Sequence, residues 1–109
     1  MQKREVVKDN KEFNDIIKTG KWIKNNYFVI YYKESNYGFP KFGIAVGTKI
    51  GKAYLRNKFK RQIRNIITTN KFLFSNKYEY IIIMKKACSE LKYAKMEEEL
   101  KRLIEKVSK

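Results

Sequence analysis

Three stretches of the chain repeat apolar residues at the spacing of an α-helix. The predicted helices run roughly from Asn10 to Thr19, from Ala53 to Thr69 or Asn70, and from Ser89 to Val107. Each places its apolar side chains on one stripe that can face a core. The stripes consist of Phe13, Ile16 and Ile17; of Leu55, Phe59, Ile63 and Ile66; and of Leu91, Met96, Leu100, Leu103, Ile104 and Val107.

The ends of the first predicted helix are marked by polar residues and a glycine. Asp9 followed three residues later by Glu12 has the spacing of an N-terminal capping box. Gly20 stands where a helix of this length would end. We therefore expect a short helix that ends just before the first strand.

Aromatic and β-branched runs predict the strands. They cover Lys21–Lys24, Tyr27–Tyr32, Phe42–Gly47 and Tyr78–Met84. We expect Phe42–Gly47 to run antiparallel to the strand before it, because a short turn-like segment joins them. The order α-β-β-β-α-β-α predicts a single α+β domain over residues 1–109, a two-layer sandwich of about four strands in a mixed sheet with three helices.

The charge of the chain is far from balanced. It carries 26 Lys and Arg against 11 Asp and Glu, a formal net charge of +15. Such a field favours a polyanion, either nucleic acid or an anionic membrane surface. No apolar run approaches the roughly 20 residues that span a bilayer, so nucleic acid is the better partner.

The residue types that are missing narrow the chemistry. The chain has no histidine and one cysteine, Cys88, which excludes histidine triads and zinc sites built from Cys and His. A single cysteine allows no disulfide within the chain, and the basic start Met1–Lys8 lacks the apolar segment of a secretory signal. We expect a cytoplasmic protein in which Cys88 is a small buried residue.

The basic residues are concentrated in the middle of the chain. No Asp or Glu occurs between Ser35 and Lys77, and Arg56, Lys60 and Arg64 repel one another along one helix. A solvated helix face usually mixes charges of both signs. The glycines of Gly47–Lys52 also allow close backbone approach at the helix start, without matching a Walker loop. The pattern favours binding of a polyanion over an ordinary solvated face.

The segment from Gly43 to Arg64 resembles the signature of the bacterial ribonuclease P protein subunit. Its core is Gly-Lys-Ala-x-x-Arg-Asn-x-x-Lys-Arg-x-x-Arg, from Gly51 to Arg64. The remaining predicted helices and strands agree with that family over nearly the whole chain. The resemblance implies a cytoplasmic ribonucleoprotein endonuclease that removes the 5′ leader of precursor tRNA. In that family the RNA subunit cleaves with Mg²⁺, and the protein binds the RNA subunit and the leader, as a monomer in a 1:1 complex with RNA.

Carried onto this chain, the resemblance implies two binding surfaces. The residues expected to contact the RNA subunit are Lys49, Lys52, Arg56, Asn57, Lys58, Lys60, Arg61 and Arg64. An alternative for Arg56 or Arg61 is an ion pair with Glu98 or Glu105 of the last helix. The residues expected to bind the leader are Phe13, Val29 and Tyr31, although Phe13 could equally be a core residue. Ile17 departs from the family, where an aromatic is common.

Two further expectations follow from the resemblance or compete with it. The family implies a left-handed β-α-β crossover, against the general preference for right-handed ones. Competing functions are a ribosomal or general RNA-binding protein, a nuclease that uses its own acids such as Glu97–Glu99, and a DNA-binding protein. We expect no catalytic residue in the chain and no metal bound by the protein alone.

Overall fold

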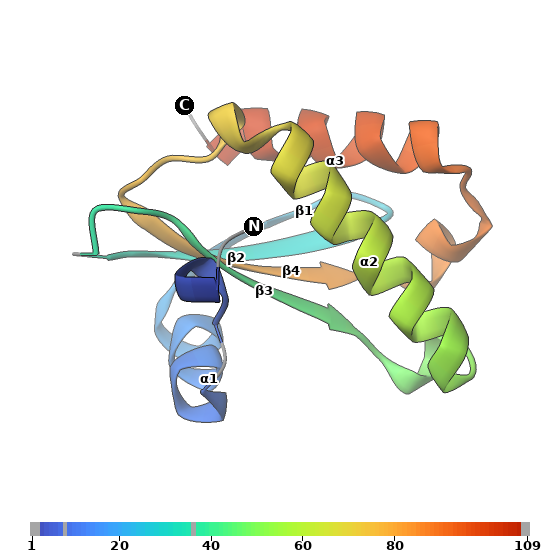
Figure 1. Cartoon of the computed structure of the whole chain (residues 1–109), viewed down its shortest axis with the longest axis horizontal. Helices are drawn as coiled ribbons and strands as arrows, with labels where there is room; N and C mark the ends of the chain where they lie inside the picture. The colour runs from blue at the N-terminus through green and yellow to red at the C-terminus, as the bar shows by residue number, and fades with distance from the viewer. Residues whose placement is uncertain (1–2, 8, 36, 108–109) are drawn as a thin grey trace.

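The chain folds into one four-stranded sheet with helices on both of its faces (Figure 1). The structure is a computed structural model and describes residues 3–7, 9–35 and 37–107. The basic segment Met1–Lys8, considered above as a signal, lies partly outside these residues. The helices are α1 (Asn10–Thr19), α2 (Ala53–Thr69) and α3 (Tyr93–Val107), and the strands are β1 (Lys21–Lys24), β2 (Phe28–Glu34), β3 (Lys41–Val46) and β4 (Tyr78–Met84).

The strand order is β1-β2-β4-β3, so β2 and β3 are antiparallel as predicted but are not neighbours in the sheet. Strand β4 lies between them, antiparallel to β2 and parallel to β3. The reason lies in β4 itself, since Tyr80, Ile81 and Ile82 are almost completely buried. A strand that is apolar on both faces belongs in the middle of a sheet.

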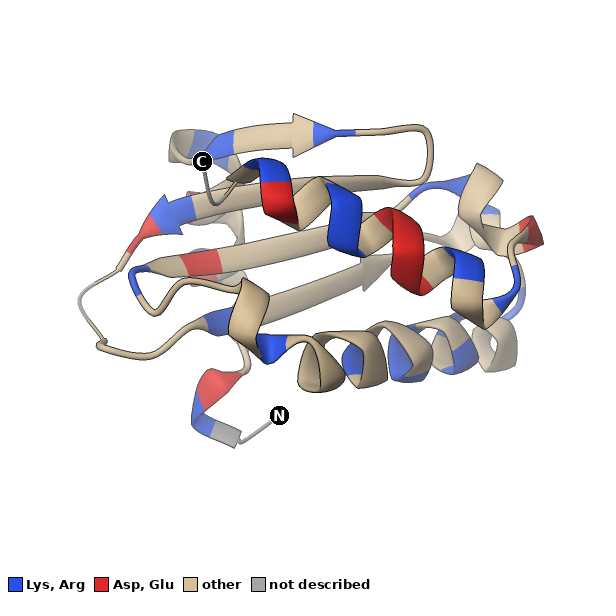
Figure 2. Cartoon of the chain, turned by 90° about the horizontal axis from the view of Figure 1, so that it is seen from above, with Lys and Arg blue, Asp and Glu red and all other residues tan. Residues whose placement is uncertain are grey.

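Helix α2 connects the parallel strands β3 and β4, as a parallel pair requires. It crosses on the side of the sheet that also carries α3 (Figure 1). Followed through Figures 1 and 2, this crossover is left-handed. The hand implied by the family resemblance is therefore confirmed, and the general statistical preference would have given the opposite one.

The sheet separates a large core from a small one. The large core lies between the sheet and the layer of α2 and α3, and includes Phe28, Ile30, Phe42, Tyr80, Ile82, Phe59, Ile63, Met96 and Leu100. The small core lies under α1, where Ile16 and Ile81 are fully buried. None of the described helices is both long and apolar enough to span a membrane.

The first helix begins as predicted and ends on Gly20 for an unexpected reason. The Asp9 carboxylate accepts a hydrogen bond of 2.9 Å from the Lys11 N–H. Gly20 has an ordinary extended backbone with φ −80°. A Cβ at this position would lie 2.5 Å from the Ile16 carbonyl oxygen and 2.7 Å from that of Tyr32. Glycine is thus required by close backbone packing against β2 rather than by a left-handed turn.

The last helix is shorter than predicted, because its first turn is replaced by a separate short 3₁₀ helix. This segment, η4 (Lys86–Glu90), contains the buried Cys88, as expected for that residue. Three further 3₁₀ turns are η1 (Lys3–Glu5), η2 (Thr48–Ile50) and η3 (Lys71–Leu73).

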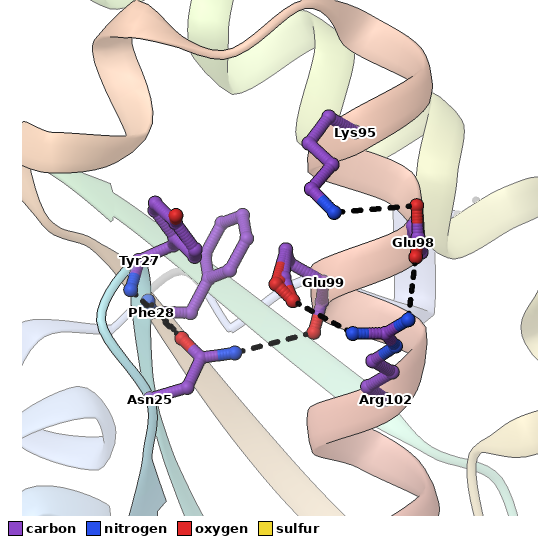
Figure 3. A network of polar contacts seen from close by, with 7 residues as sticks. All are labelled: Asn25, Tyr27, Phe28, Lys95, Glu98, Glu99 and Arg102. Atoms are coloured by element: carbon purple, nitrogen blue, oxygen red, sulfur yellow. Dashed lines mark hydrogen bonds and ion pairs between the residues drawn. The ribbon is translucent and has the colours of Figure 1, made fainter.

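Asn25 fixes the turn between β1 and β2 (Figure 3). Its side-chain oxygen accepts hydrogen bonds of 2.8 Å from the N–H groups of Tyr27 and Phe28. Its amide nitrogen donates to the Glu99 carbonyl of α3 at 3.3 Å, and Lys85 donates to the Asn25 carbonyl at 3.1 Å. The edge strand β1 is therefore held in a defined position relative to the rest of the sheet.

Candidate RNA-binding surfaces

The basic residues predicted to bind RNA gather on and before the outer face of α2. Phe59, Ile63, Ile66 and Ile67 are buried against the core and so turn the opposite side of the helix to solvent. The exposed members of the predicted set are Lys49, Lys52, Asn57, Lys58, Arg61 and Arg64, while Arg56 and Lys60 are half-buried on the flank. We call the eight residues together the α2 basic face.

No carboxylate neutralises the α2 basic face within the described residues. None of the ion pairs found there involves a residue of α2. Of the two acids considered as alternative partners, Glu98 is engaged by Lys95 at 3.6 Å and by Arg102 at 2.6 Å on its own helix (Figure 3), and Glu105 occurs in none of the ion pairs of the described residues. In Figure 2, α2 bears only basic bands, whereas α3 alternates basic and acidic ones.

The start of α2 explains the glycine and lysine of the sequence motif. Gly51 has φ +150°, a backbone conformation that glycine adopts readily and other residues rarely do. Lys52 is the N-cap residue, and its side chain makes no capping hydrogen bond. A helix start without a side-chain cap, with Lys49 and Lys52 exposed beside it, suits a phosphate group.

Tyr54 belongs to the same surface and was missed by the sequence analysis. Its side chain is 68% exposed, in the first turn of α2. At helical spacing it shares a side of the helix with Lys58 and Arg61. The sequence did contain a signal for it, because Tyr54 is an aromatic residue outside the apolar stripe of this helix and so is not needed in the core. An exposed ring among cations can stack on an unpaired base.

The three residues predicted to bind the leader lie on the sheet face that α1 partly covers. Tyr31 and Phe13 pack against the small core of Ile16 and Ile81. Val29 is on the same face by strand alternation, paired across from Ile83. The sequence prediction thus grouped residues that the fold places on one face.

Phe13 also has a structural role on that face. A Cβ at Gly43 of β3 would lie 3.0 Å from the Phe13 ring and 2.6 Å from Ile81 Cδ1. The absence of a side chain at Gly43 therefore gives the ring room to pack on the sheet. Ile17 is half-buried and packs against the same small core.

A polar cluster closes the other end of this face. Glu79 of β4 is only 7% exposed, and its Oε1 has no hydrogen-bond partner among the described residues. Glu12 of α1 binds Lys41 of β3 at 3.0 Å, and Lys33 of β2 pairs with Asp15 of α1. This cluster ties α1 to three strands. The Glu12 carboxylate binds Lys41 rather than completing the predicted capping box with Asp9.

Burial is the main cause that raises the pKa of Glu79 to about 7, and a hydrogen bond and negative charge from Glu12 add to the effect. Lys41 and Lys33 oppose it. The pKa of Glu12 is lowered, first by its hydrogen bond with Glu79 and then by Lys41. Glu12 therefore carries the charge of the pair at neutral pH, while Glu79 is partly protonated.

We expect Glu79→Gln to flatten the pH dependence of stability. In the folded state Glu79 retains a proton that it releases near pH 4.5 in the unfolded chain. The stability that this proton contributes is therefore present in full below about pH 4.5 and is lost as the pH rises through about 7. The variant should melt several degrees above the unmodified protein at about pH 8 and differ little at about pH 5. Thermal melts across this range test it. Glu34→Gln, which replaces an exposed carboxylate nearby, is the control. If the melting temperature of Glu79→Gln fell with pH as steeply as that of the unmodified protein, the raised pKa would not belong to Glu79.

The two surfaces extend toward the same end of the molecule. Strand β3 leads through η2 into the start of α2, at the end of the sheet away from α1 (Figure 1). Val29 lies toward this same end, since it pairs with Ile83 near the carboxyl end of β4. One nucleic-acid ligand could thus pass from the sheet to α2. Within the described residues, no group of three or more Asp, Glu, Cys or His side chains is placed to hold a metal ion.

Comparison with known proteins gives a consistent result. The Ribonuclease P family model matches residues 1–108. The ribonuclease P protein component of Mycoplasma capricolum is 44% identical, over 98% of this chain and 99% of that one. Among solved structures, the RNase P protein of Thermotoga maritima has a TM-score of 0.87 at 31% identity, covering 94% of this chain and 97% of that one. The Staphylococcus aureus RNase P protein has a TM-score of 0.87 at 28% identity, covering 96% and 95%.

Proposed function

The chain belongs to the bacterial ribonuclease P protein family, and we propose that it binds the RNA subunit of this enzyme through the α2 basic face and the 5′ leader of precursor tRNA on the α1 side of the sheet. As a ribonuclease P protein component it is part of the holoenzyme that cleaves tRNA precursors. In our proposal, all of residues 1–109 act as one RNA-binding domain without a catalytic residue of its own.

The observation that carries this proposal is that, among the residues the structure describes, no acidic side chain forms an ion pair with α2. A row of like charges on one helix destabilises the free protein, and each arginine fork can make two hydrogen bonds to a phosphate. The phosphates of an RNA backbone would both neutralise this repulsion and accept the hydrogen bonds of the arginine guanidinium groups. Tyr54 adds a ring to the same face.

The second surface supports the leader-binding part of the proposal. Tyr31 and Val29 present an aromatic ring and an aliphatic side chain on the sheet face that α1 partly covers, and stacking on a ring depends little on which base is bound. Such a surface suits a single strand of varied sequence. The leader would then be held beside the start of α2, where the protein meets the RNA subunit.

Metal ions enter this proposal through the RNA partner alone. The family's division of labour implies that Mg²⁺ is bound by the RNA subunit, where it supports cleavage, and the protein's residues orient RNA and reduce repulsion between RNA chains. We further propose that the protein works in the cytoplasm as one copy per RNA subunit.

Cleavage of precursor tRNA by a bacterial ribonuclease P RNA at low Mg²⁺ concentration tests the function. We expect the protein to stimulate release of the 5′ leader strongly, and to cleave nothing without the RNA. Stimulation should fall steeply as salt is raised, because phosphate contacts release counterions. RNA binding without stimulation would instead place the chain among general RNA-binding proteins, and cleavage by the protein alone would indicate a nuclease.

A further inference from the structure

Trp22 lies beside the proposed leader surface, on the edge strand β1. It is 57% exposed and stands directly across from Tyr31 in the antiparallel pairing of β1 with β2. Residues that are directly opposite in such a pair share one face of the sheet. The indole of Trp22 therefore continues the aromatic surface of Tyr31 by one strand.

The surroundings of Trp22 are basic. The Lys24 ammonium lies 5.6 Å from the centre of the indole ring. Lys24 is also across from Val29, so it lies on the same face as the leader surface. Strand β1, with the sequence Lys-Trp-Ile-Lys, contains no acid. A cation beside an exposed ring is the combination that binds a base and its phosphate together.

The strand that carries Trp22 is anchored by its turn. Asn25 holds the β1–β2 turn through three side-chain hydrogen bonds, one of which reaches α3 (Figure 3). An isolated exposed apolar side chain is common on protein surfaces. Trp22 differs because it is paired with Tyr31 across the two strands, has Lys24 beside its ring and stands on a strand whose turn is anchored by Asn25.

We propose that Trp22 stacks on a nucleotide of the single-stranded 5′ leader, beyond the nucleotide bound at Tyr31. This inference rests on the function proposed above. The sheet order β1-β2-β4-β3 puts Trp22 on the opposite side of Tyr31 from β3, the strand over which α2 packs. The nucleotide at Trp22 is thus farther from the RNA subunit, and a long leader gains a contact that a leaderless tRNA lacks.

The test measures the affinity of the reconstituted holoenzyme for precursor tRNA with a long leader and for mature tRNA. Trp22→Thr removes the ring but retains a β-branched residue suited to a strand. We expect it to weaken precursor binding about 5- to 50-fold without changing mature tRNA binding, as loss of one stacked base would. Trp22→Phe should retain most of the affinity. Phe72→Ala, which removes a 79% exposed ring in η3, is the matched control and should change neither.

A second readout needs no substitution. Trp22 is the only tryptophan of the chain, so its fluorescence in the holoenzyme reports on this position alone. Leader-bearing precursor should quench it, and mature tRNA should not.

The outcomes separate this inference from the proposed function. If Trp22→Thr bound precursor tRNA as tightly as wild type while replacement of Tyr31 by leucine weakened precursor binding, the role of Trp22 would be overturned. The proposed function would be unaffected. Equal losses for precursor and mature tRNA would also overturn the role of Trp22. A wild-type holoenzyme that does not distinguish the two tRNAs would remove the proposed leader surface, and the Trp22 contact with it.

Discussion

Replacing Arg61 by alanine is expected to weaken association of the protein with the RNA subunit by roughly 10- to 100-fold. Arg61 is exposed on α2, and none of the ion pairs among the described residues involves it. Its guanidinium can therefore form charge-assisted hydrogen bonds to phosphate without first breaking an internal contact. Hydrogen bonds to charged groups contribute about 1.5–3 kcal/mol each, which sets the expected range.

The salt dependence and a matched arginine make this result specific. Loss of one phosphate contact should reduce the log–log slope of affinity against salt by about 0.7 to 0.9. Arg61→Lys keeps the charge but not the two-pronged geometry, and should fall between wild type and alanine. Arg102→Ala is the control, because it removes an exposed arginine from α3 that is already paired with Glu98 and Glu99. If Arg61→Ala and Arg102→Ala had the same effect, the α2 basic face would not be the RNA-binding surface.

The elements of this fold could be predicted from local pattern, but the pairing of its strands could not. Helical stripes and strand runs depend on the side chains of neighbouring residues, so their positions were found within a few residues. The placement of β4 between β2 and β3 depends on which strand is buried on both faces. The sequence shows that β4 is apolar on both faces, but β2 is also apolar along much of its length, so the pattern alone did not order the strands. The hand of the crossover followed from family resemblance and not from general rules.

The sites show a similar division. The basic residues of the α2 basic face could be proposed from the sequence because no acid stands near them along the chain, whereas Asn57 followed from the family resemblance, and their binding role stays a prediction. Tyr54 and Trp22 were missed as binding candidates because an aromatic residue reads as core until its exposure is known. Glu79 was missed because its pKa near 7 arises from burial beside Glu12, a residue 67 positions away along the chain (79 minus 12). Non-local contacts of this kind leave no local sequence signal.

Tyr31→Ala is expected to weaken binding of leader-bearing precursor tRNA by roughly 5- to 100-fold, with little effect on mature tRNA. The ring lies on the open side of the sheet next to the small core, on the face shared with Val29. Stacking of one base on an aromatic ring is worth about 1–3 kcal/mol by alanine substitution. Mature tRNA has no leader to lose, so the ratio of the two affinities isolates the contribution of the leader.

Tyr31 also packs against the cluster that holds α1, and this second role must be separated from stacking. Tyr31→Leu keeps an apolar side chain against α1 but offers no flat face to a base, while Tyr31→Phe keeps the ring and removes the hydroxyl. If stacking is the cause, the leucine variant melts near wild type and loses precursor affinity, and the phenylalanine variant retains it. Tyr93→Ala, at the start of α3 on the other side of the sheet, should leave both affinities unchanged. Should the leucine variant bind precursor as tightly as wild type, or lose precursor and mature tRNA equally, Tyr31 would be a structural residue that supports α1 and the leader would be bound elsewhere.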